Sequence, residues 1–271
     1  MSSSPSGVRA ATTLALWAAS WQVGSSADHV LAALDGTGFR AGVRAGSACA
    51  AEASGLPGPG EPSAGTVDLL ALLRRGGRPA LLLPVSGDLR GMPAGGDVVI
   101  PALDAGAAVV LPDAGVALVP TDGHWRAFRS GPPHPTLALG EVTQLVDGAV
   151  TEATRTLATA DISSSQGNPR EAVRRAILAE AVDTPPGMPP AAASLLAKSI
   201  TLAALLAVAA GHTTAAVTSR EMAVVDDALH PLGSAVREAR RTAVAATVSE
   251  LLSASGRSAP FSAIGSRDRH R

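Results

Sequence analysis

The 271-residue chain has almost no cysteine or lysine and few aromatic side chains. It contains no tyrosine, three phenylalanines and three tryptophans, so we expect a core of Leu, Val and Ala whose backbones approach closely. Its single cysteine, Cys49, excludes an intramolecular disulfide and a thiolate metal cluster. Its single lysine, Lys198, leaves nearly all positive charge to arginine.

Neither sign of charge dominates. The chain has 22 Lys and Arg against 23 Asp and Glu, a formal net charge of −1, which excludes a globally basic nucleic-acid binder. Hydrophobic residues make up 46 % and charged residues 17 %, so the chain can bury a sizeable core and is not disordered throughout. The length fits one large domain or two small ones.

Motifs for nucleotide, metal or nucleophilic chemistry are also missing. The glycines of residues 36–42 follow a predicted helix rather than a strand and lack dinucleotide spacing. The six histidines form neither HxxxH nor HExxH, so we expect no metal site and no cofactor. We interpret the acidic residues Glu221, Asp226 and Asp227 as a solvated helical turn rather than an acid–base pair.

Helical spacing is clearest near the N-terminus. Leu14, Trp17 and Trp21 recur on one face of a helix predicted over residues 8–21, so we interpret this segment as a packed helix and not a secretory signal peptide. We expect both tryptophans to be buried. A second helix is predicted to begin near Ser25 or Ser26, and Thr66 is predicted to cap a third.

Strand patterns follow these helices. Residues 80–85 form a short apolar run typical of a buried strand, and residues 40–44 and 98–101 are further candidates. Between residues 106 and 129, β-branched runs alternate with turns rich in Pro, Asp and Gly. This pattern predicts an antiparallel three-stranded meander.

The segment GPPHPT, residues 131–136, predicts a rigid linker, and no strand pattern follows it. We expect four or five long helices, including one over 139–159, one capped by Asn168, and one from Pro189 to about residue 210. Ser219 is predicted to cap another helix, and Pro231 to begin or kink the last. The apolar run of residues 191–211 is long enough for a membrane span, but Lys198 interrupts it, so we expect a buried bundle helix.

These patterns predict an α+β fold. Residues 1–135 form a mixed α/β half with a small sheet that includes the meander, residues 136–256 form a helical bundle half, and residues 257–271 form a disordered basic tail. Near the end of the bundle, Arg237, Arg240 and Arg241 share one helix face, and we interpret them as surface ion-pair partners.

The loop of residues 85–93 is the one segment that resembles a ligand site. It follows a predicted buried strand, and Ser86, Asp88 and Arg90 are our candidate ligand-binding residues. Asp88 and Arg90 are two positions apart and face the same side of an extended backbone. They either flank a polar ligand or form an ordered connection in which Asp88 caps a turn and Arg90 pairs with Asp88 or Asp104.

The segments LLLPVSGDLRGMP, ALDAGAAVVLP and GVALVP, in that order, resemble a family of uncharacterised alanine-rich actinobacterial proteins. The abundance of Ala and Gly also indicates the codon usage of a high-GC genome. The resemblance extends over residues 66–256 and implies a leucine-rich helix before the loop and a helical half after it. The family has no assigned activity, so the resemblance implies no chemistry.

The lack of a visible nucleophile–base pair favours a non-enzymatic cytoplasmic protein that serves as a structural or protein-interaction module. We expect a protein partner or a homo-oligomer, and neither nucleic acid nor membrane as partner. The alternative is a small-molecule or anion-binding protein or enzyme with its site at the 85–93 loop. A third interpretation is a nucleic-acid accessory factor that uses the arginines of the C-terminal tail.

Overall fold

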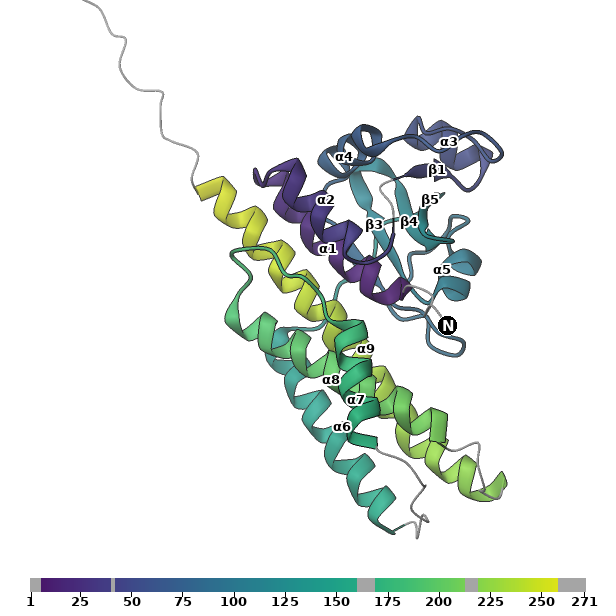
Figure 1. The fold of residues 1–271 in the computed structure, drawn as a ribbon, viewed down its shortest axis with the longest axis vertical. Helices are drawn as coiled ribbons and strands as arrows, with labels where there is room; N and C mark the ends of the chain where they lie inside the picture. Colours follow the sequence, from purple (N-terminus) through teal and green to yellow (C-terminus); the bar gives the residue numbers. More distant parts are fainter. Residues whose placement is uncertain (1–5, 40–41, 160–168, 213–218, 258–271) are drawn as a thin grey trace, which may run out of the picture.

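In the computed structural model, described over residues 6–39, 42–159, 169–212 and 219–257, every strand lies in the first half of the chain (Figure 1). Long helices make up the described part of the second half and extend away from the sheet (Figure 1). The α+β class expected from the sequence is therefore confirmed. The domain boundaries stay a prediction, and the tail from residue 258 onward lies outside the described residues.

The five-stranded sheet has the order β1-β5-β4-β3-β2. Its strands are β1 (Val43–Ala45), β2 (Ala80–Leu82), β3 (Ala108–Leu111), β4 (Val116–Thr121) and β5 (His124–Arg129). The last three pair antiparallel as consecutive neighbours, which confirms the predicted meander. Strand β1 pairs parallel with β5 at one edge, and β2 pairs with β3 and forms the other edge.

Short helices surround this sheet. They are α1 (Gly7–Gln22), α2 (Ala27–Asp35), α3 (Ala48–Ser54), α4 (Thr66–Arg75), α5 (Val99–Ala105) and the 3₁₀ turn η1 (Pro112–Ala114). The strand expected over residues 98–101 is wrong, because these residues begin α5. Val98 and Ala102 are buried four positions apart while Ile100 is 71 % exposed, a helical spacing that so short an apolar run does not reveal.

Helix α1 is the central element of the N-terminal half. It is buried from Ala10 to Ser20 because it contacts strands β3 and β4 as well as helix α9 of the other half. Trp17 is buried as expected, and its indole N–H donates to the Asp183 carbonyl at 2.9 Å. Trp21 is only partly buried, and its indole N–H donates to the Leu70 carbonyl at 2.9 Å.

The second half contains α6 (Leu139–Thr159), α7 (Pro169–Glu180), α8 (Pro190–His212) and α9 (Ser219–Arg257). Of the two alternatives for Pro231, the start of a helix is wrong, because the proline lies inside one continuous helix of 39 residues. A proline removes one helical hydrogen bond. Here α9 runs between α6 and α8, and its packing against both helices supports it through the proline (Figure 1).

Helix α8 contains the apolar run noted in the sequence. Residues Pro190–Ala210 are long and apolar enough to cross a membrane, with a mean hydropathy of 1.9, and 33 % of the apolar stretch is buried inside the protein. Single helices of this kind also occur in the cores of soluble proteins, so this is weak evidence for a span. In the structure α8 packs against α7 and α9, and Lys198 pairs with Asp147 of α6.

Candidate functional site

The 85–93 loop follows β2 and begins with a tight turn. Val85 and Asp88 exchange backbone hydrogen bonds of 3.1 and 2.9 Å, and Gly87 has a φ of +83°, which favours glycine. Ser86 is exposed at this turn, and no contact joins it to the charged residues that follow. Of the three candidate residues, the structure therefore brings together only Asp88 and Arg90.

Asp88 is the centre of a cluster that joins the loop to α9. Its carboxylate accepts hydrogen bonds from the Arg90 Nε at 2.9 Å, the Arg237 Nη2 at 2.7 Å and the Ser234 hydroxyl at 2.8 Å. Its side chain is 10 % exposed. Burial alone would raise the pKa of Asp88, but the hydrogen bonds from Arg237, Arg90 and Ser234 outweigh it and hold the pKa well below its usual range.

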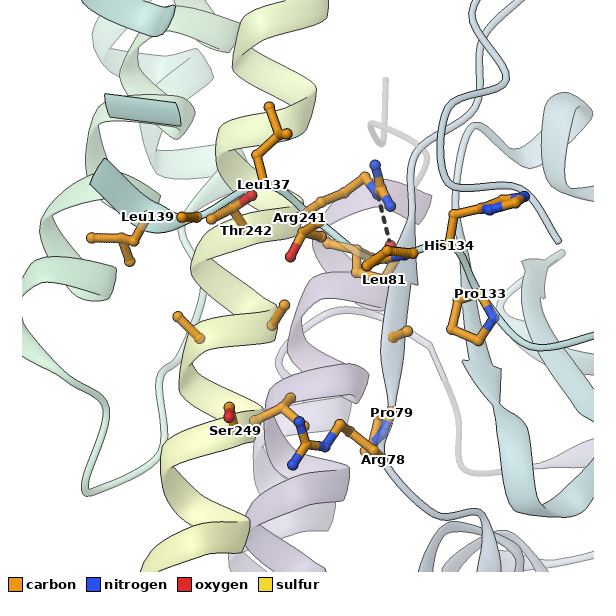
Figure 2. Close-up of a pocket in the computed structure, with 17 residues that line it drawn as sticks. Arg78, Pro79, Leu81, Pro133, His134, Leu137, Leu139, Arg241, Thr242 and Ser249 are labelled. Atoms are coloured by element: carbon orange, nitrogen blue, oxygen red, sulfur yellow. Dashed lines mark hydrogen bonds between the residues drawn. The ribbon is translucent and has the colours of Figure 1, made fainter. Parts of the chain in front are cut away.

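A second ion pair lies one helical turn further along α9. The Arg241 guanidinium donates from Nη1 to Glu238 at 2.6 Å and from Nε to the Leu81 carbonyl on the free edge of β2 at 3.2 Å (Figure 2). Glu238 also accepts from the backbone N–H of Leu137 at 3.4 Å. Gly91 lets the loop approach closely, because a Cβ built there would lie 2.0 Å from Arg241 Nη2.

A third pair joins α9 to the end of α7, where Arg240 donates to Glu180 at 3.0 Å. The expectation of surface ion pairs was correct about pairing but wrong about exposure, since Arg240 is 2 % and Arg241 4 % exposed. Small residues placed four apart, Ala235, Ala239 and Ala243, are the sequence signal for a buried face here. Arginines at this spacing are also common on exposed helix faces, so the sequence alone does not show that Arg240 and Arg241 are buried.

Two cavities adjoin the linker and α9, and both are lined by His134, Pro135, Leu137 and Arg241. The first, which we call the loop groove, has a volume of about 540 Å³ and lies between the loop, the linker and α9. Its lining includes Leu89, Arg90, Met92, Pro135 and Leu137. The second, which we call the strand-edge cavity, has a volume of about 450 Å³ and lies between the free edge of β2 and α9 (Figure 2).

Chemistry in the loop groove is limited by pairing. Glu238 and Arg241 bond to each other, and Arg90 bonds to Asp88, which leaves no free carboxylate beside a nucleophile. Among the described residues, no group of three His, Cys, Asp or Glu could hold a metal ion. The side chains of Glu221, Asp226 and Asp227 lie outside the described part.

Comparisons with known proteins give relatives without a stated activity. Residues 11–139 match the family described as Rv1486c-like protein, N-terminal domain, and residues 140–241 match its C-terminal domain. The chain is 33 % identical over 274 residues to uncharacterized protein MT1533 of Mycobacterium tuberculosis, covering 86 % of this chain and 95 % of that protein. It is 30 % identical over 263 residues to uncharacterized protein MAV321 of Mycobacterium avium, covering 82 % and 86 %. No solved structure matches the chain.

Proposed function

The chain belongs to the Rv1486c-like family, and we propose that it is a non-enzymatic protein-interaction module. These matches confirm the expected resemblance to a family of uncharacterised actinobacterial proteins. The binding surface we assign is the loop groove. One observation carries this assignment: the charged groups of the groove bond to groups within the protein, while large apolar side chains at its rim remain exposed.

The rim of the loop groove has the make-up of a protein interface. Leu89 and Leu137 are 48 % and 47 % exposed, one on the loop and one on the linker, and both line the groove together with Met92 and Pro135. Arg90 adds a guanidinium on a side chain that is 57 % exposed. Apolar anchors with an arginine at the edge are enriched where proteins bind proteins. A partner with apolar and acidic side chains suits this surface.

The same geometry weighs against the alternative of an anion or substrate at the 85–93 loop. Arg90 and Arg237 already converge on Asp88, so this carboxylate takes the position that an anionic ligand would need. The polar groups around Asp88 therefore hold the loop against α9, and the proposed interaction surface lies beside them.

The proposal includes the cytoplasmic location expected from the sequence. Its support is that α8, the one apolar helix of sufficient length in the described part, packs against α7 and α9 and pairs its lysine with α6. Fractionation of host cells tests this directly. Recovery of the protein in the soluble fraction is expected, and recovery only in alkali-resistant membranes would contradict it.

The interaction itself is tested by photo-crosslinking in the host cell. A photoreactive amino acid replaces Leu89 in one variant and Ile100, an equally large exposed residue on α5 outside the groove, in the control. We expect a discrete protein adduct from position 89 that is absent from position 100 and is lost when Leu137→Asp is added. The adduct mass distinguishes a second copy of this chain from another protein. Equal labelling at both positions would refute the proposal.

A further inference from the structure

We propose that the strand-edge cavity binds a small amphipathic carboxylate, a single carboxylate on a short hydrocarbon chain. This site adjoins the interaction surface proposed above, because Pro135, Leu137 and Arg241 line both cavities. It extends along the free edge of β2, and its anchor, Arg78, lines this cavity and not the loop groove.

The walls of this cavity are mainly apolar. Strand β2 is an edge strand, so its outer side faces α9 across the cavity, with the Arg241 bond to the Leu81 carbonyl bridging the two elements (Figure 2). Pro79 and Leu81 form the wall on the sheet side, and Ala245 and Val248 form the wall on α9. Leu139, at the start of α6, contributes to the third side. Such walls favour a hydrocarbon over a polar ligand.

The charge of the lining is positive and comes from one residue. Two guanidinium groups line the cavity, but that of Arg241 is already paired with Glu238. Arg78 is exposed, and within the described ranges it forms no ion pair. No Asp or Glu lines the cavity. One unpaired guanidinium beside apolar walls matches one carboxylate, which its planar fork can bind through two parallel hydrogen bonds.

The dimensions of the cavity match this class of ligand. The lining extends along α9 from Arg241 to Ser249, eight helical steps, or about 12 Å at a rise of about 1.5 Å per residue. Figure 2 shows Arg241 near one end of this stretch, and Arg78 and Ser249 near the other. The volume of about 450 Å³ falls within the roughly 300–1,000 Å³ of small-molecule sites. A chain of several carbons fits along the apolar walls with its carboxylate at Arg78.

The experiment is calorimetric titration of the full chain with octanoate as the probe. Octanamide, which has the same chain without the charge, and acetate, which has the charge without the chain, are the comparators. We expect octanoate to bind at least 10-fold more tightly than either, because charge-assisted and apolar contacts both contribute. Arg78→Gln is expected to weaken octanoate binding about 10-fold. Arg126→Gln, an arginine of β5 that does not line the cavity, is the matched control and leaves the affinity unchanged.

A second variant tests where the hydrocarbon chain of octanoate binds. Ala245→Leu fills the cavity from α9 and should abolish octanoate binding while the melting temperature shows that the protein is folded. Octanoate and octanamide binding equally well, no effect of Arg78→Gln, or no octanoate binding at millimolar concentration would each overturn the proposal. Neither Arg78 nor Ala245 lines the loop groove, so failure here is distinct from failure of the proposed interaction.

Discussion

Substitution of Asp88 tests whether the loop cluster is a structural clamp. Asp88→Ala removes the acceptor of hydrogen bonds from Arg90, Arg237 and Ser234 together. Arg90 contributes little to the loss, because its side chain is 57 % exposed and water replaces the carboxylate. Ser234 is buried and the Arg237 side chain is 23 % exposed, so both lose an acceptor where water reaches them poorly.

The expected loss follows from these two groups. Leaving a buried donor without its partner costs about 1–3 kcal/mol. Because Arg237 is partly hydrated, we expect Asp88→Ala to lower the free energy of unfolding by about 2–3 kcal/mol in total. In a chain of this size each kcal/mol lowers the melting temperature by roughly 2–4 °C, so thermal unfolding should shift down by roughly 4–12 °C. Glu152→Ala, which removes an exposed ion pair with Arg155, is the control and should leave the melting temperature unchanged.

The pH dependence of the effect has a definite sign. The pKa of Asp88 is lowered in the folded protein, so the unfolded chain takes up the proton first as the pH falls. The stabilisation is complete above the unfolded pKa of about 3.9 and is lost as the pH falls below it. The stability difference between wild type and Asp88→Asn, measured by urea unfolding, should be constant from pH 8 to about pH 5 and shrink below about pH 4.

One result would refute this reasoning. If Asp88→Ala melts at the same or a higher temperature than wild type, the charge cluster does not stabilise the fold. Functional sites often carry charge arrangements that cost stability. The loop would then be a ligand site in which Asp88 is held between Arg90 and Arg237 for binding rather than for folding.

Three further substitutions test the packing by chemical denaturation. Trp17→Ala should cost about 3–5 kcal/mol, because the indole is buried and donates to Asp183; a loss below about 1 kcal/mol would show that α1 is not held in the core. Gly91→Ala should destabilise more than Gly95→Ala, since both have a φ of +81° but only Gly91 meets Arg241; equal losses would mean that backbone strain alone matters. Thr242→Val should raise stability by up to about 1 kcal/mol, because the buried hydroxyl has no hydrogen-bond partner among the described groups; a loss would reveal an unseen partner.

The meander and the helix around Trp17 could be predicted because their signals are local. Apolar runs with β-branched residues specify β3 and β4, the alternating residues of His124–Arg129 specify β5, and each turn closes a short loop. The change of period at the linker likewise separates the sheet from the long helices. In contrast, the strand expected at residues 98–101 is a helix, because four apolar residues fit both periods and packing decides between them.

The candidate loop shows the same division. The spacing of Asp88 and Arg90 placed both side chains on one face, and the structure pairs them. The other partners of Asp88, Ser234 and Arg237, are 146 and 149 residues away in sequence, so no local pattern identifies them. Ser86, the third candidate, is exposed at the turn, and the partners of Asp88 on this loop and on α9 are Arg90, Ser234 and Arg237.

Local periodicity and turn chemistry thus determined which segments of this chain become helices and which become the meander, because these preferences act over a few residues. Only the tertiary structure decided that β1 joins β5 in parallel, that α9 crosses to the free edge of β2, and that Arg240 and Arg241 are buried with their carboxylates. Burying an arginine is favourable only when a partner is already in place. The packed fold supplies that partner from a distant segment in Glu180, and it encloses Arg241 together with Glu238, a neighbour on its own helix.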